Sequence, residues 1–258
     1  VSNAYASLSP RRMGWYMFPP QLVSSLGSLD WVQTLSIHEY RHIVQYAKNR
    51  QNFTKLAWFF YGSIGQSMMR YSIPDWFFEG DAIVMETALS EGGRGRMPEF
   101  DQEIRTFALQ GDKYSYDQAY LGSYKRFYPS HYHLGYPLTA FARVNFGFDT
   151  WDKVLDRTSK ISFWPYAFGG SLKKYTGLNV KRLYDSAMSD LKVRWHNNQE
   201  DLEITQAKKI NFLKKKNYTN YLNPKYDKNG NIVFIKEPLD ELPALFMIDS
   251  SGRETKIM

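Results

Sequence analysis

The fold is decided by one stretch, WVQTLSIHEYRHIVQY, at residues 31–46. Its apolar side chains recur at the spacing of a helix with 3.6 residues per turn and form two stripes, one of which begins with Trp31 and Leu35. Asp30 precedes the stretch, where a short side-chain oxygen can accept hydrogen bonds from the free N–H groups of a first helical turn. The pattern predicts a helix that is apolar on two sides and lies at the centre of the fold.

The same stretch carries His38-Glu39-Tyr40-Arg41-His42, which is an HExxH motif. Histidines four residues apart lie one turn apart on the same face of a helix, so both imidazoles can bind one metal ion. Glu39 points about 100° around the helix from His38, close enough to a zinc-bound water to accept its proton. Chance produces this spacing roughly 0.004 times in a chain of this composition. The motif therefore predicts a zinc site rather than two surface histidines with an incidental glutamate.

The composition restricts the kind of site that the chain can build. Its 258 residues are 43% apolar and 23% charged, which is enough for a large core and fits one large domain or one domain plus a smaller piece. No apolar run reaches the length of about 18 residues that a membrane-spanning helix needs. The chain has no cysteine, so a metal site must use His, Asp and Glu. The five histidines are His38, His42, His131, His133 and His196.

A zinc site needs a third protein ligand, with the fourth position left to water. The metzincin pattern would place glycine at position 45 and histidine at position 48, but the chain holds Gln45 and Lys48. The segment WFFEGDAIVME at residues 76–86 instead resembles the W-x-x-E-G-x-A helix of the gluzincin metallopeptidases, with a further glutamate seven residues after the first. This resemblance implies that Glu79 is the third zinc ligand and that Glu86 accepts the other N–H of a ligand histidine. If the resemblance is set aside, the alternative interpretation of Glu79 is a capped or salt-bridged residue of an aromatic helix.

A third motif, Tyr132-His133-Leu134-Gly135, is similar to the Y-x-x-G helix of the gluzincin aminopeptidases. The similarity implies that Tyr132 donates a hydrogen bond to the oxyanion of the tetrahedral intermediate. His131 and His133 flank it, and either can take the same role; the alternative is a tyrosine hydrogen-bonded in a loop. The G-x-M-E-N strand with which those aminopeptidases hold a free amine is absent, so aminopeptidase specificity is not implied.

The three motifs occur in the gluzincin order, which implies a mainly α (α+β), thermolysin-like peptidase domain over residues 1–205. Residues 3–20 are expected to be extended and to form a short N-terminal edge strand that ends at Pro19 and Pro20. Periodicity and helix breakers predict further helices over residues 74–89, 99–111, 133–146, 149–158, 165–175 and 179–197.

The character of the chain changes after residue 205. Residues 206–219 are predicted to be a basic linker, because five lysines there contribute much of the net charge of +7: Lys208, Lys209, Lys214, Lys215 and Lys216. Residues 220–258 hold two short β runs with turn residues between them. They resemble one blade of a TolB-like or WD-repeat β-propeller, cut short at Met258. Such a propeller would act as a substrate gate or docking platform.

These patterns predict zinc-dependent hydrolysis of peptide bonds, with Zn²⁺ as the cofactor and a peptide or protein as the substrate. The alternative is a catalytically inactive metal-binding or peptide-binding scaffold that works with a β-propeller. A solvated linker explains the lysine run better than nucleic-acid binding does. Bacterial proteins join gluzincin domains to propellers, which implies a location in the cell envelope, periplasmic, at the surface or secreted, with a signal peptide upstream of Val1.

Overall fold

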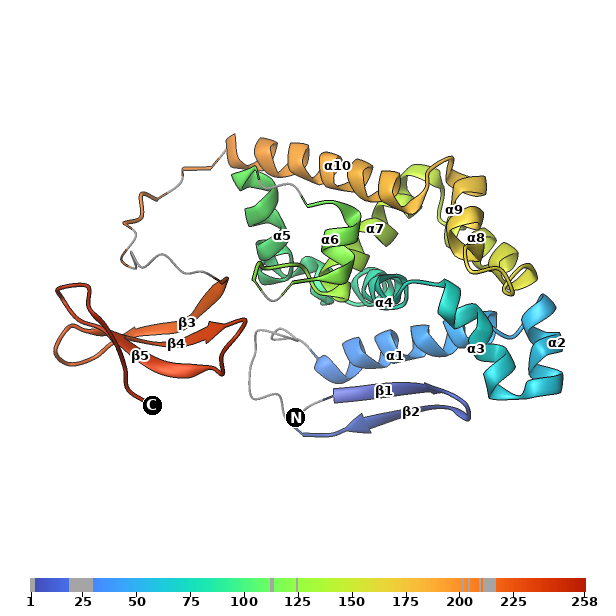
Figure 1. Cartoon of the computed structure of the whole chain (residues 1–258), viewed down its shortest axis with the longest axis horizontal. Coiled ribbons are helices and arrows are strands. Elements are labelled where there is room, and N and C mark those ends of the chain that lie inside the picture. Colours follow the sequence, from blue (N-terminus) through green and yellow to red (C-terminus); the bar gives the residue numbers. More distant parts are fainter. Residues whose placement is uncertain are drawn as a thin grey trace. The chain divides into compact units, whose positions relative to one another are not determined.

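The computed structural model describes residues 3–18, 30–111, 114–123, 125–200, 202–203, 205–208, 210 and 217–258. The chain divides into two compact units, one made of residues 1–120 and 129–198 and the other of residues 121–128 and 199–258. Helices dominate the first unit and an antiparallel sheet the second (Figure 1). The prediction of a mainly α fold with short strands is therefore confirmed. Pro19, Pro20, Lys209 and residues 214–216 lie outside the described part of the chain.

The extended N-terminal segment is a hairpin of two strands, β1 (Asn3–Leu8) and β2 (Arg11–Tyr16). The strands are antiparallel, with register partners from Asn3 and Tyr16 to Leu8 and Arg11. A turn at Ser9 and Pro10 reverses the chain, so the segment expected to be one edge strand supplies two. The hairpin packs along the first helix of the unit (Figure 1).

That first helix, α1 (Trp31–Lys48), confirms the helix predicted over residues 31–46. A carboxylate oxygen of Asp30 accepts hydrogen bonds from the backbone N–H groups of Val32 and Gln33 at 2.9 and 3.2 Å, as expected of a helix-capping residue. A pair of helices that the sequence did not predict follows, α2 (Asn52–Tyr61) and α3 (Ser63–Ser72).

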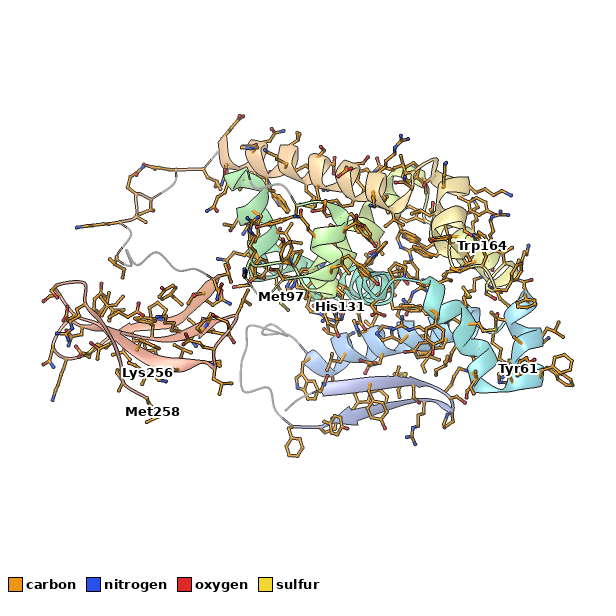
Figure 2. The ribbon with its side chains drawn as sticks, viewed as in Figure 1. Tyr61, Met97, His131, Trp164, Lys256 and Met258 are labelled. Atoms are coloured by element: carbon orange, nitrogen blue, oxygen red, sulfur yellow. The ribbon has the colours of Figure 1, made fainter. Side chains whose placement is uncertain are left out.

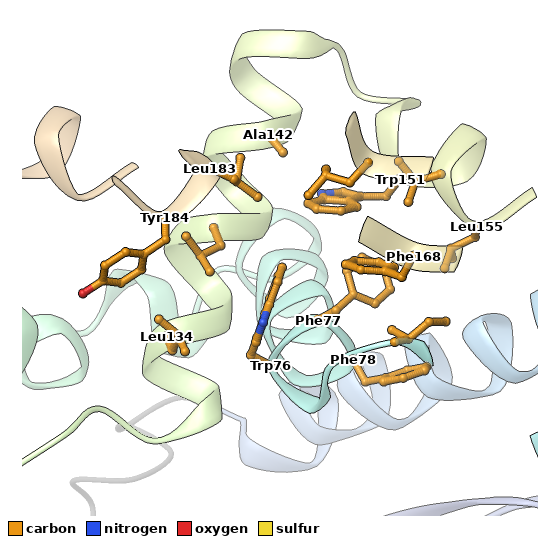
Figure 3. Close-up of a cluster of buried hydrophobic side chains, with 14 of the residues drawn as sticks. Trp76, Phe77, Phe78, Leu134, Ala142, Trp151, Leu155, Phe168, Leu183 and Tyr184 are labelled. Atoms are coloured by element: carbon orange, nitrogen blue, oxygen red, sulfur yellow. The ribbon is translucent and has the colours of Figure 1, made fainter. Parts of the chain in front are cut away.

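The remaining helices of this unit form two hydrophobic clusters among the described residues, and the larger one is an aromatic core (Figure 3). Trp76 and Phe77 are completely buried against Trp151 and Phe168, and the last two rings stack with their centroids 6.0 Å apart. This packing fixes the helix that carries Trp76, and with it the glutamates that follow. The helices are α4 (Asp75–Leu89), α5 (Pro98–Gln110), α6 (Tyr116–Leu121), α7 (His131–Phe146), α8 (Thr150–Lys160), α9 (Ala167–Thr176) and α10 (Val180–Glu200). The helices predicted in these regions are confirmed, whereas α6 was not predicted.

The second unit contains a four-stranded antiparallel meander, β3 (Thr219–Tyr226), β4 (Ile232–Pro238), β5 (Ala244–Ile248) and β6 (Glu254–Lys256), paired in that order. Asp227 and Asp249 each accept backbone N–H groups two and four residues later, which closes two similar turns. The two predicted β runs are β4 and β5. That the meander is a propeller blade stays a prediction. None of the helices in the described part of the chain is long and apolar enough to cross a membrane.

Candidate metal centre

Three ligand atoms from α1 and α4 converge at the centre of the helical unit. His38 Nε2 lies 3.1 Å from Glu79 Oε2, and His42 Nε2 lies 3.4 Å from the same oxygen. The two Nε2 atoms are 3.2 Å apart. Both histidines are buried and Glu79 is partly buried. The structure thus brings together the three residues that the sequence predicted as metal ligands.

His38 is oriented by a carboxylate on its other nitrogen. Its Nδ1 lies 2.8 Å from Glu86 Oε2. Glu86 also accepts three hydrogen bonds from Arg94, from the backbone N–H at 2.9 Å and from Nε and Nη2 at 2.8 Å each. Burial alone would raise the pKa of Glu86, but the hydrogen bonds from Arg94 and His38 outweigh it and lower this pKa to about 2. The ionised carboxylate favours the tautomer with hydrogen on Nδ1, which leaves the Nε2 lone pair for a metal.

The position of Arg94 depends on the turn that follows α4. Gly93 adopts a positive φ of 89°, which favours glycine, and a Cβ there would lie 2.6 Å from Thr87 Cα. The chain therefore doubles back closely enough for Arg94 to reach Glu86. The Arg94 guanidinium Nη2 also lies 2.7 Å from His38 Nδ1, but it donates to Glu86 Oε2 at 2.8 Å, which leaves Nδ1 to donate to the same carboxylate. The Arg94 Cζ lies 5.2 Å from the Tyr132 ring centroid.

His42 is oriented by an amide. Its Nδ1 lies 2.8 Å from Gln45 Oε1. The Gln45 Nε2 group donates to Phe78 O at 3.0 Å and to Asp81 Oδ2 at 2.9 Å. Because two acceptors fix the NH₂ end of the amide, its oxygen must face His42, and His42 must donate from Nδ1. The Nε2 of His42 is then also a lone-pair donor toward the cluster.

Asp81 anchors this second arrangement. It is completely buried and accepts from Arg41 Nε at 2.7 Å and from Arg143 Nη2 at 2.5 Å. Burial raises the pKa of Asp81, but the charges of Arg41 and Arg143 more than offset it, and the pKa lies below its ordinary value. The ion pairs join α1, α4 and α7 at one buried carboxylate. The same carboxylate accepts the hydrogen bond from Gln45 Nε2 and so holds the amide in place.

The donor set fits a metal ion. With both Nδ1–H groups engaged by Glu86 and Gln45, two imidazole lone pairs and one carboxylate oxygen face each other. In the metal-free chain, burial raises the pKa of Glu79, but hydrogen bonds that His38 and His42 donate from Nε2 when they are protonated lower it well below its ordinary range, so this carboxylate is ionised. Three electron-pair donors at this separation repel each other unless protons or a metal ion lie among them, so the deprotonated cluster can bind a metal ion.

Glu39 lies beside the ligands on α1 and is buried. Burial raises its pKa above the ordinary value, although the charges of His38 and His42 oppose the shift. A carboxylate with a raised pKa holds a proton more readily than an exposed one. This property is the one that a general base needs near neutral pH.

Tyr132 enters the centre because two helices cross at glycine. A Cβ on Gly80 would lie 2.1 Å from the carbonyl carbon of Gly135, and one on Gly135 would lie 1.9 Å from Trp76 O. Helices α4 and α7 therefore touch through their backbones, which brings the first turn of α7 beside Glu79. The Tyr132 ring centroid lies 6.5 Å from that of His38. Burial, together with the charge of Glu79, raises the Tyr132 pKa to about 12.

The two histidines next to Tyr132 have other surroundings. His131 is exposed, and its ring lies 4.5 Å from the ring of Tyr132. His133 packs on Phe100 at 4.5 Å between centroids, and its Nδ1 lies 2.8 Å from Ser130 Oγ. Burial lowers the pKa of His133, and the charge of Arg94 adds to the shift. Of Tyr132, His131 and His133, we take Tyr132 as the residue nearest the proposed ligands, because its ring centroid lies 6.5 Å from that of His38.

Sequence reasoning missed Gln45, Asp81 and Arg94. Gln45 stands three residues after His42 on one helix face, which was a usable signal for a contact. Asp81 and Arg94 gave no such signal, since their partners lie on other elements. No model of a protein family matches this chain, and neither a curated protein nor a solved structure does. The chemistry assigned to the centre therefore depends on its own residues and their geometry.

Proposed function

We propose that this protein is a zinc-dependent hydrolase of peptide bonds. The observation that carries the proposal is the spacing of the ligand atoms of His38, His42 and Glu79, which lie 3.1 to 3.4 Å apart. Atoms placed tetrahedrally about 2.0–2.1 Å from one zinc ion lie about 3.3–3.4 Å from each other. Two histidines and one carboxylate are also a donor set of catalytic zinc sites, which keep their fourth position open.

The zinc ion, when bound, would polarise a peptide carbonyl and lower the pKa of a water ligand to about 7. Glu39 is suited to accept the proton of that water, because its carboxylate is buried and has a raised pKa. The same carboxylate then transfers the proton to the leaving amine. Tyr132, with a pKa of about 12, keeps its O–H proton at neutral pH and can donate a hydrogen bond to the developing oxyanion.

The test compares the zinc-loaded protein with its Glu39→Gln variant on a library of peptides analysed by mass spectrometry. We expect cleavage by the unmodified protein and a loss of about 10²–10⁴-fold in kcat/KM in the variant, since general-base catalysis is worth that much. Zinc content should stay the same in both, because Glu39 is not among the proposed ligands.

Two results would contradict the proposal. Peptide cleavage that survives Glu39→Gln would exclude the mechanism. A protein that holds zinc but cleaves no peptide of the library would instead match an inactive metal-binding scaffold. A Tyr132→Phe variant serves as a second measurement, and it should lower kcat while leaving the zinc content unchanged.

A further inference from the structure

One end of the helical unit exposes an unusual number of large apolar side chains, which we call the aromatic surface. They come from α2, from α3 and from the loop between α8 and α9. Each is between 54% and 76% exposed. The members are Leu56, Phe59, Phe60, Tyr61, Ile64, Phe163, Trp164 and Tyr166.

The two segments that form this surface are in direct contact. The rings of Phe53 and Phe163 meet edge to face with centroids 5.4 Å apart. Asn52 Nδ2 donates to Ser159 Oγ at 2.7 Å, next to the loop that carries Phe163. Figure 2 shows Tyr61 and Trp164 at the same end of the helical unit. The exposed rings therefore belong to one surface rather than to two scattered sets.

The exposure follows from how α2 and α3 pack. Among the residues of α2, Thr54 and Ala57 are the buried ones. A Cβ on Gly65 of α3 would lie 2.1 Å from Ala57 O, so the two helices meet through small residues. The large side chains are consequently left on the outer face. Gly62 joins the helices, and Phe60, Tyr61 and Ile64 stand on both sides of this tip.

The two segments that carry the aromatic surface hold basic residues and no acidic ones. Residues 50–74 contain three basic and no acidic residues, and residues 157–180 contain four basic and no acidic ones. Lys55 on α2 and Lys160 at the end of α8 are exposed. The acidic residues that flank these segments are paired, Asp75 with Arg70 and Asp156 with Lys48.

We propose that the aromatic surface docks this protein on an anionic phospholipid bilayer. Tyr and Trp rings favour the boundary between lipid and water, and basic residues are attracted to anionic headgroups. Apolar patches of this kind on a folded protein mark interaction sites. A Cβ on Gly62 would meet no atom within 4 Å, so the tip between α2 and α3 faces open space and can enter a deformable lipid layer. This inference is independent of the proposed zinc chemistry.

The absence of cysteine permits a direct test. A Tyr61→Cys variant is labelled with an environment-sensitive fluorophore and mixed with vesicles of phosphatidylcholine, with or without phosphatidylglycerol. Val144→Cys, at an exposed position of α7, is the matched control. We expect a blue shift and stronger emission at position 61 with the anionic vesicles and no change at position 144. The same response at both positions, or none at position 61, would overturn the proposal.

A second measurement removes the apolar side chains. The variant Phe59→Ser/Phe60→Ser/Ile64→Ser should bind anionic vesicles at least tenfold more weakly in co-sedimentation. The control replaces three equally exposed apolar residues elsewhere, in the variant Leu89→Ser/Val144→Ser/Phe148→Ser, and should bind like the unmodified protein. Equal losses in both variants would contradict the proposal. Self-association that the first variant abolishes, without vesicle binding by the unmodified protein, would identify the surface as a protein interface instead.

Discussion

The two histidines of the candidate metal centre are supported by different chemistry. His38 faces the ionised carboxylate of Glu86, whose charge is balanced by Arg94. His42 faces the neutral amide of Gln45. The buried carboxylate of Asp81 accepts a hydrogen bond from that amide and does not contact the imidazole. The imidazole of His38 thus contacts a charged carboxylate directly. The carboxylate of Asp81 acts on His42 only through the Gln45 amide, which orients the ring but carries no charge itself.

This difference indicates that Glu86 and Gln45 affect their histidines in different ways. A hydrogen bond to an ionised acceptor is roughly twice as strong as one to a neutral acceptor. Glu86 should therefore make His38 the more basic ligand, while Gln45 mainly fixes the ring of His42. The larger response to substitution is expected on the Glu86 side, and the predictions that follow measure this asymmetry.

The largest effect is predicted for Glu86→Gln. One amide oxygen cannot replace two carboxylate oxygens that accept from His38 and three times from Arg94. We expect zinc affinity to fall by about 100-fold, at the upper end of the range for groups that orient metal ligands. Chelator competition measures this. Stability should fall by about 3–5 kcal/mol, because the Arg94 charge loses its buried partner.

A smaller effect is predicted for Gln45→Met, which keeps the side-chain length and removes the amide. His42 loses a neutral acceptor, so we expect zinc affinity to fall by about tenfold. Arg143→Met is the matched control, because it removes one ion pair of Asp81 and contacts neither a histidine nor Gln45. It should change stability more than zinc affinity. If Gln45→Met weakened zinc binding as much as Glu86→Gln, the proposed asymmetry would be wrong.

The prediction that concerns zinc binding least is the acid stability of the zinc-free protein. The pKa of Glu86 is about 2 in the folded chain, below the ordinary value of 4.5. A depressed pKa contributes stability above the unfolded value that is lost as pH falls through the folded one. The stability difference between the unmodified protein and Glu86→Gln should thus shrink between pH 4.5 and about 2. Denaturant titrations at several pH values measure it, and a difference that grows on acidification would contradict this account.

Much of the centre was predictable because its signals are local. The spacing of His38 and His42 on one helix, and the resemblance that picked out Glu79 and Glu86, named residues that the structure places together. Arg94 was not predictable, since it reaches Glu86 through a turn at Gly93 whose path only the fold defines. Asp81 was missed because its partners Arg41 and Arg143 lie on α1 and α7, and only the fold brings them to it.

The fold shows the same limit. Strongly periodic helices were predicted within a few residues, whereas α2 and α3 were missed because their apolar side chains lie largely outside the core. In the second unit, β3 was not among the predicted β runs, and it contains Asn223 and Pro224, whose residue types are typical of turns. A register shift between Leu222 and Lys225, with a positive φ at Asn223, accommodates them there.

The most direct test of the central claim is the zinc content of the protein after loading at neutral pH and dialysis. We expect one zinc ion per chain in the unmodified protein. The Glu79→Gln variant, which keeps the shape but removes the charge of the third ligand, should retain far less zinc. A folded, unmodified protein that holds no zinc, or a Glu79→Gln variant that holds just as much, would contradict the assignment of His38, His42 and Glu79 as the metal site.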